Sequence, residues 1–202
     1  MLETLLRPDT ETYAHQKLWT REECDFLVES GRLEERYELI EGTIYYKMAM
    51  NAAHRIALML LYRWLIGLFD VLSVQTEKPI SIPGENNAIN APLPDAAVTR
   101  QPTTAYTPRH PGPADISLIV EVSDSTLRLD LNVKARLYAL AGIAEYWVMD
   151  IAGRQIYRHR QPNGVRYEDI FIFGENEMIA APGRSETVRV GELFAPVSTT
   201  TE

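Results

Sequence analysis

The chain has little cysteine, little excess positive charge and no long apolar run. Its 202 residues include one cysteine, Cys24, so no intrachain disulfide can form, and a chain of this length can bury a core without one. The longest apolar run, Ile56 to Tyr62, falls far short of the roughly 20 residues of a membrane span. Met1 to Lys17 lack the apolar core of a signal peptide. We therefore expect one soluble, cytoplasmic domain over residues 1–202, with its core at about 20–195 and no membrane partner.

The charge balance argues against one class of function. Twenty Lys and Arg face 28 Asp and Glu, which gives a net charge of −8 at pH 7. Domains that bind nucleic acid through a broad basic surface are usually strongly positive. Any contact with nucleic acid therefore has to use a local basic patch.

The first half of the chain shows helix and hairpin signals. Thr20 and Glu23 have the spacing of a capping box and predict a helix that ends near Ser30. Residues 36–47 alternate on both sides of a glycine, which predicts a β-hairpin. Apolar residues recur at helical spacing over 52–69 and predict a long amphipathic helix.

Short strands follow, separated by a proline-rich loop. We expect strands at 71–76 and 79–82 and a third that begins at Asp95. Residues 101–113 contain four prolines and predict an extended surface loop. Residues 116–122 form a nearly continuous apolar run that Glu121 interrupts, a pattern typical of a central strand buried on both faces.

A helix and two further strands complete the expected elements. The helix covers about 130–141 and ends at Gly142, and strands at 145–150 and 155–160 form an antiparallel pair. Strand, helix and strand over 116–150 make a βαβ-like unit. The sequence therefore predicts an α/β or α+β domain around a mixed sheet.

Three carboxylates stand in apolar surroundings where an ionised acid is costly. Glu121 lies inside the central strand, Asp95 opens a strand directly after a proline, and Glu38 lies in the first hairpin. Burying such a group costs several kcal/mol unless a cation or hydrogen bonds compensate it. The alternative for each acid is a strand end where it is exposed or paired with an arginine.

Lys134 supplies a possible partner for these acids. Asp130, Lys134 and Tyr138 follow one another at four-residue spacing and so share one face of the predicted helix. An exposed Asp–Lys pair without function would show the same spacing. However, the end of the central strand and the start of the next helix share one sheet edge, so Lys134 can reach toward Glu121.

One combination of residues runs through these elements: Tyr37 to Gly42, His54, Pro94, Asp95, Glu121 to Ser123, Asp130, Lys134, Tyr138, Gly142 and Glu145 to Trp147. This combination resembles the Uma-type "putative restriction endonuclease" family of the PD-(D/E)XK nuclease superfamily. The resemblance implies a restriction-endonuclease-like mixed β-sheet core flanked by helices, a divalent metal and phosphodiester hydrolysis.

The resemblance also implies a metal site. It makes Asp95 and Glu121 metal ligands and Glu38 the upstream acid that completes the site, with Glu41 as a weaker substitute. Carboxylate oxygens suit Mg²⁺ or Mn²⁺. Zinc is disfavoured because the chain has a single cysteine and its four histidines show no ligand spacing.

The implied catalytic set is Glu38, Asp95, Glu121 and Lys134. In the common superfamily pattern the lysine stands two residues after the acid, where this chain has Ser123, whereas the family places its lysine on the following helix, as here. Lys134 would position or deprotonate the attacking water or stabilise the transition state. The resemblance gives His54 and Tyr138 supporting roles.

A local basic stretch is the candidate DNA contact. Arg154, Arg158 and Arg160 share one face of a strand by the period of two and can follow a phosphate backbone. A solvated edge hairpin, protected from aggregation by its arginines, explains the same pattern.

Three functions remain open at this stage. The first is a Mg²⁺-dependent DNA endonuclease, and the second is a catalytically silent domain of the same fold that dimerises or regulates. The third is a carbohydrate or small-molecule hydrolase that uses Asp95 and Glu121 as an acid/base pair, which leaves Lys134 without a role. A homodimer is a further expectation, with apolar surface near Trp147 and Tyr157 as the candidate contact.

Overall fold

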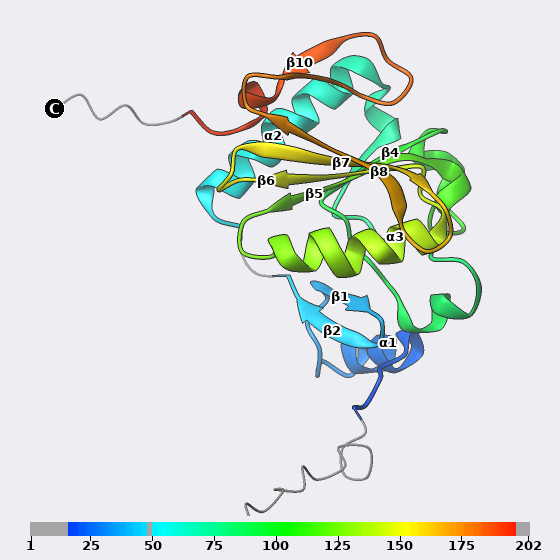
Figure 1. The fold of residues 1–202 in the computed structure, drawn as a ribbon. Helices are drawn as coiled ribbons and strands as arrows, with labels where there is room; N and C mark the ends of the chain where they lie inside the picture. Colours follow the sequence, from blue (N-terminus) through cyan, green and yellow to red (C-terminus); the bar gives the residue numbers. More distant parts are fainter. Residues whose placement is uncertain (1–15, 48–49, 197–202) are drawn as a thin grey trace, which may run out of the picture.

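A computed structural model describes residues 16–47 and 50–196 of the chain. In this part of the chain a mixed six-stranded sheet is flanked by helices on both faces, which confirms the predicted fold class (Figure 1). The helices and strands, in chain order, are α1 (Arg21–Glu29), β1 (Tyr37–Ile40), β2 (Thr43–Tyr46), α2 (Ala52–Leu68), β3 (Val74–Thr76), β4 (Ala96–Thr99), β5 (Ile116–Ser123), a π-helical segment (Leu129–Lys134), α3 (Ala135–Ala141), β6 (Glu145–Asp150), β7 (Gln155–Pro162), β8 (Tyr167–Gly174), β9 (Met178–Ala180) and β10 (Thr187–Arg189).

The sheet is mixed because one of its strand pairs is parallel. Its order is β3-β4-β5-β6-β7-β8, and β5 and β6 run parallel while every other neighbouring pair is antiparallel. The π-helical segment and α3 form the crossover between β5 and β6, as the βαβ pattern predicted. β5 is buried along nearly its whole length, which confirms it as a central strand.

Each face of the sheet has its own apolar core. α2 covers one face, where it packs with Val120 and Trp147, and α3 covers the other, where Ile119 and Tyr146 lie. In Figure 1 α2 and the β9–β10 hairpin lie above the sheet, α3 lies below it, and the β1–β2 hairpin and α1 lie further below. The β1–β2 hairpin therefore stands on the α3 side of the sheet. Glu121 points to the same side, because side chains alternate along β5 and Ile119 faces α3.

Local signals fix the ends of several elements. The Thr20 hydroxyl and the Glu23 carboxylate form the predicted capping box at the start of α1. The side chain of Asn51 accepts a hydrogen bond from the His54 amide and so caps α2. Gly142 ends α3 with a φ of +81°, a conformation that favours glycine.

Some local predictions were wrong. Residues 79–82 form no strand but an irregular segment, because the Ile80 and Ser81 amides bond to loop carbonyls of Pro92 and Pro111 and not to a strand. The predicted strand 71–76 starts as a 3-10 turn and is extended only over β3. The proline-rich loop contains a 3-10 turn, Thr103–Tyr106.

Two further findings concern surfaces. Trp147 is fully buried in the α2-side core and offers no contact surface itself, whereas Ile172, the strand partner of Tyr157, is 54% exposed. No helix among the described residues is long and apolar enough to cross a lipid bilayer.

Candidate functional site

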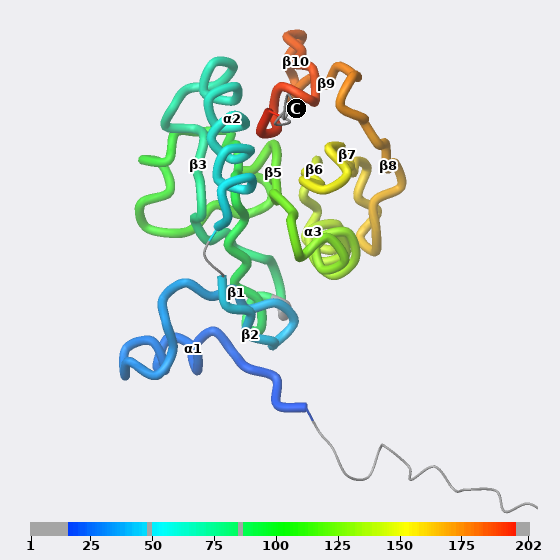
Figure 2. Tube along the Cα trace, turned by 90° about the vertical axis from the view of Figure 1, so that its left-hand side faces the viewer, coloured from blue at the N-terminus to red at the C-terminus, as the bar shows by residue number. Residues whose placement is uncertain are grey.

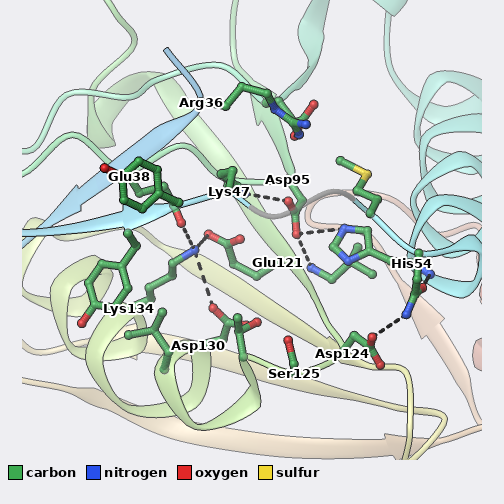
Figure 3. Close-up of a pocket in the computed structure, with 18 residues that line it drawn as sticks. Arg36, Glu38, Lys47, His54, Asp95, Glu121, Asp124, Ser125, Asp130 and Lys134 are labelled. Carbon is green, nitrogen blue, oxygen red and sulfur yellow. Dashed lines mark hydrogen bonds and ion pairs between the residues drawn. The ribbon is translucent and has the colours of Figure 1, made fainter. Parts of the chain in front are cut away.

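A pocket of about 190 Å³ opens where the end of β5 meets the π-helical segment, the start of α2 and the β1–β2 hairpin. Figure 3 shows its polar side chains pointing toward one another from these elements. All four residues of the predicted catalytic set line it. Its polar lining residues include Arg36, Glu38, Lys47, Asn51, His54, Glu77, Asp95, Glu121, Asp124, Ser125, Thr126, Asp130 and Lys134.

Lys134 lies at the centre of three carboxylates. Its Nζ is 2.8 Å from Glu38 Oε2, 3.0 Å from Glu121 Oε1 and 3.6 Å from Asp130 Oδ1 (Figure 3). All four side chains are buried, with Lys134 only 3% exposed. The structure thus excludes the exposed Asp–Lys pair and places Lys134 on the same side of the sheet as Glu121.

The buried carboxylates decide the protonation of this lysine. Burial alone would lower the pKa of Lys134, but the charges of Glu121, Glu38 and Asp130 outweigh it, so the pKa lies above its ordinary value. The pKa of Glu121 is raised to about 8, chiefly by burial. The positive charge of Lys134 lowers this pKa, while the negative charges of Asp95 and Glu38 raise it further. Lys134 is therefore a charged donor at neutral pH.

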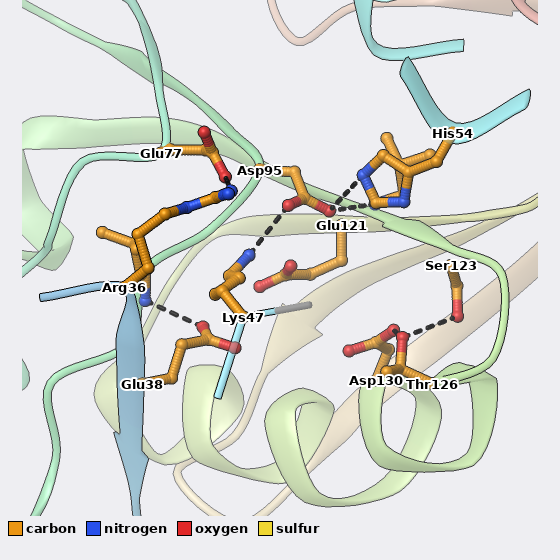
Figure 4. A network of polar contacts seen from close by, with 12 residues as sticks. Arg36, Glu38, Lys47, His54, Glu77, Asp95, Glu121, Ser123, Thr126 and Asp130 are labelled. Atoms are coloured by element: carbon orange, nitrogen blue, oxygen red, sulfur yellow. Dashed lines mark hydrogen bonds and ion pairs between the residues drawn. The ribbon is translucent and has the colours of Figure 1, made fainter. Parts of the chain in front are cut away.

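Asp95 is held by a different cation. Its Oδ1 is 2.8 Å from Lys47 Nζ, and its Oδ2 accepts the Val122 amide at 2.8 Å and lies 3.7 Å from His54 Nε2 (Figure 4). Burial raises the pKa of Asp95, but Lys47 and the amide outweigh it, so this pKa lies below its ordinary value. His54 Nε2 is itself buried and has no hydrogen-bond partner among the described residues.

Supporting hydrogen bonds orient the acids around Lys134. The Tyr138 hydroxyl donates to Glu121 Oε1 at 2.9 Å, and the Thr126 hydroxyl donates to Asp130 Oδ2 at 2.7 Å. Leu93 donates its amide to Glu38 Oε1 at 2.9 Å. These contacts restrict the carboxylates to a few orientations. The π-helical segment ends at Lys134, and such segments often occur at functional sites.

The sequence analysis missed Lys47. A signal for it was present, since Lys47 stands two residues after Tyr45, which pairs with Glu38, so the period of two puts all three on one face of the hairpin. Glu41 does not join the pocket and pairs with Arg136 at the surface.

The acids fit a hard divalent cation by their chemistry. Glu38, Asp95 and Glu121 offer carboxylate oxygens to one pocket, the donor type that Mg²⁺ and Mn²⁺ prefer. The ammonium groups of Lys47 and Lys134 bind these oxygens in the structure. No group of three His, Cys, Asp or Glu side chains in the described ranges is arranged to hold a metal ion. The three carboxylates are therefore suitable ligands for a divalent cation. In the structure, their orientations are those that bind Lys47 and Lys134.

The three predicted DNA-binding arginines lie outside this pocket. Arg158 and Arg160 bind Glu145, with nitrogen–oxygen distances of 2.8 and 3.4 Å, and Arg158 pairs across the sheet with Trp147 on the α2 face. Arg154 pairs with Glu175. The arginines thus have partners within the protein, and their contact with nucleic acid stays a prediction.

The sheet with its flanking helices places the chain in a known class. A solved structure described as a putative nuclease belonging to DUF820, from Anabaena variabilis, superposes with a TM-score of 0.62 over 83% of this chain and 96% of that chain, at 15% sequence identity. The fold is thus that of a nuclease-like α/β protein. The chain belongs to the Uma2 family, described as "Putative restriction endonuclease", whose model matches residues 27–188. No curated protein gave a significant match.

Proposed function

We propose that the protein is a Mg²⁺-dependent DNA endonuclease that hydrolyses phosphodiester bonds at the Lys134 pocket. The observation that carries the proposal is the buried Lys134 ammonium between Glu38 and Glu121, in the pocket that Asp95 also lines. Three carboxylates and a lysine around one cavity are the groups that metal-assisted hydrolysis needs. Membership of the Uma2 family supports a nuclease.

Each residue has a distinct task in this proposal. Glu38, Asp95 and Glu121 would hold the divalent cation, which would supply Lewis-acid activation of water and neutralise charge on the phosphate. Lys134 donates hydrogen bonds to the attacking water or to the phosphate oxygens in the transition state. In the metal-free protein the charges of the surrounding carboxylates raise the pKa of Lys134, which favours this donor role. Tyr138 orients Glu121, and His54 stands beside Asp95.

One observation favours a second function. Lys47 and Lys134 already bind carboxylate oxygens of the pocket, and the chain carries a net charge of −8, which opposes binding to DNA. A catalytically silent domain of the same fold, acting as a dimerising or regulatory module, accounts for both facts.

A cleavage assay separates the two functions. Supercoiled plasmid and branched DNA are incubated with Mg²⁺, Mn²⁺ or EDTA, with wild type compared to Glu121→Gln and Lys134→Ala, and circular dichroism verifies that each variant folds. We expect cleavage by the wild type with either metal and none with EDTA or with the variants. A folded wild type that cuts nothing, or variants that cut as well as wild type, would reject the endonuclease proposal.

A further inference from the structure

β8 is an edge strand that lacks most of the features that usually protect such edges. It ends the order of the six-stranded sheet, and none of the described strands pairs with its outer side. It runs for eight residues, pairs with β7 without a register shift and contains no proline. Natural edge strands are commonly short, bulged, charged or interrupted by proline, because an open edge invites pairing with another strand. The opposite edge strand, β3, is only three residues long and largely buried.

The outer part of β8 is apolar on both faces. Ile170, Phe171 and Ile172 are consecutive and are 56%, 49% and 54% exposed. Ile170 faces α3, and Ile172 follows it on that face by the period of two. Phe171 points to the α2 face, where Phe173 packs against the core. Figure 2 shows β8 at the outer margin of the fold, away from β3. Contiguous exposed apolar surface of this kind is typical of an interaction site.

A groove on the helix face extends this surface. It measures about 440 Å³ and lies between α3 with its π-helical segment and the β7–β8 hairpin. Leu131 and Val133 line one wall, and Val165, 64% exposed, and Ile170 line the other. The α3 layer therefore stops short of the sheet edge, and a continuation of the sheet beyond β8 would need further apolar side chains to fill the gap.

We propose that β8 is the homodimer interface, where it pairs antiparallel with β8 of a second copy around a two-fold axis at Phe171. Phe171 then faces Phe171 of the second copy, and Ile170 faces Ile172 of the second copy. A two-fold axis perpendicular to the sheet keeps the faces aligned, so the two sheets join and both grooves meet at the axis. Apolar pairs across adjacent strands stabilise such a contact.

The charges of the strand favour a second copy over another partner. The stretch Ile170 to Gly174 carries no charge in a chain of net charge −8, so pairing of this stretch with itself adds no like-charge repulsion of its own. In the proposed register, Asp169 faces Phe173 and Glu168 faces Gly174 of the second copy, so no two carboxylates stand opposite each other. A bound peptide would cover the backbone edge, but a second copy also brings apolar side chains to both faces.

Sedimentation equilibrium on the full chain tests the contact. We expect a dimer whose dissociation constant rises by roughly 100-fold in Phe171→Glu, since a central aromatic at an interface commonly dominates its affinity. Phe26→Glu, at a phenylalanine on α1 that is 61% exposed, should leave the dimer unchanged. A wild type that stays monomeric into the high micromolar range, or a dimer that survives Phe171→Glu, would overturn the proposal.

Cysteine cross-linking tests the register. The only native cysteine is buried, so each introduced cysteine is the one exposed thiol. Opposed residues of antiparallel strands have Cα atoms about 4.5–5.5 Å apart, within the range of a disulfide. We expect Phe171→Cys to form a disulfide dimer on mild oxidation. A mixture of Ile170→Cys and Ile172→Cys should form the disulfide that each lacks alone. If neither disulfide forms, although the introduced thiols are as reactive as the exposed thiol of Phe26→Cys, the pairing is contradicted.

Discussion

Two clusters of acids and cations lie on opposite faces of the sheet, and their charge balances are opposite. On the α3 face, Glu38, Asp95, Glu121 and Asp130 outnumber Lys47 and Lys134. On the α2 face, Glu145 alone accepts hydrogen bonds from Arg158 and the Trp147 indole and lies within ion-pair distance of Arg160. We call these the lysine cluster and the arginine cluster.

The difference separates a site from a structural contact. A carboxylate bound by two guanidinium groups and an indole has its oxygens satisfied, so the arginine cluster is complete as it stands. The lysine cluster keeps an excess of negative charge beside an open pocket, and such a site attracts a further cation. The following predictions test this contrast, from the largest expected effect to the smallest.

Removing the central cation should have the largest effect on stability. Lys134→Met leaves Glu38 and Glu121 buried without their partner, and the loss of one member of a buried pair typically costs about 3–5 kcal/mol. Urea unfolding followed by circular dichroism measures the difference. Lys17→Met, which breaks an exposed pair with Glu23, should have almost no effect. Equal losses in the two variants would show that Lys134 does not stabilise the buried carboxylates of the lysine cluster.

Activity should separate the two clusters. Glu121→Gln should lower cleavage by roughly 100-fold to 1,000-fold, about 3–4 kcal/mol, because it removes one of the carboxylates that would hold the cation. Glu145→Gln should leave cleavage within about twofold, since that residue contacts only the protein. Initial rates of plasmid nicking measure both. A comparable loss of cleavage in the two variants, with both folded, would remove the distinction between the clusters.

The arginine cluster should matter for stability although it does not matter for cleavage. Glu145→Gln removes the charge that Arg158 and Arg160 share and should lower the free energy of unfolding by about 1.5–3 kcal/mol. The same urea titration gives the value. Arg189→Gln, which breaks an exposed pair with Glu192, is the control and should have almost no effect. A Glu145→Gln variant as stable as wild type would mean that the arginine cluster is not structural.

Metal affinity should respond to Lys47 with the smallest effect. Lys47→Met frees Asp95 from its ammonium and adds one net negative charge to the pocket, so Mn²⁺ should bind roughly tenfold more tightly, about 1.4 kcal/mol. Isothermal titration calorimetry measures this without any substrate. Weaker binding in Lys47→Met than in Lys17→Met would show that Lys47 does not compete with a cation for Asp95.

Most of the framework could be predicted from local patterns. The capping box of α1, the hairpin around Gly42, the helix from Ala52 and the buried strand β5 each follow from a repeat or cap over a few residues. The irregular stretch 79–82 was predicted wrongly because alternation shows which side chains are buried and not where the amides find acceptors.

The sequence alone determined the candidate groups: isolated acids in apolar strands and a lysine four residues after Asp130. Only the tertiary structure decided which charges meet. Lys47 reaches Asp95 across 48 positions, and Arg158 and Arg160 bind Glu145 on the other face. The physical reason is that local periodicity fixes the face on which a side chain lies, whereas ion pairs depend on distances between elements that only packing sets.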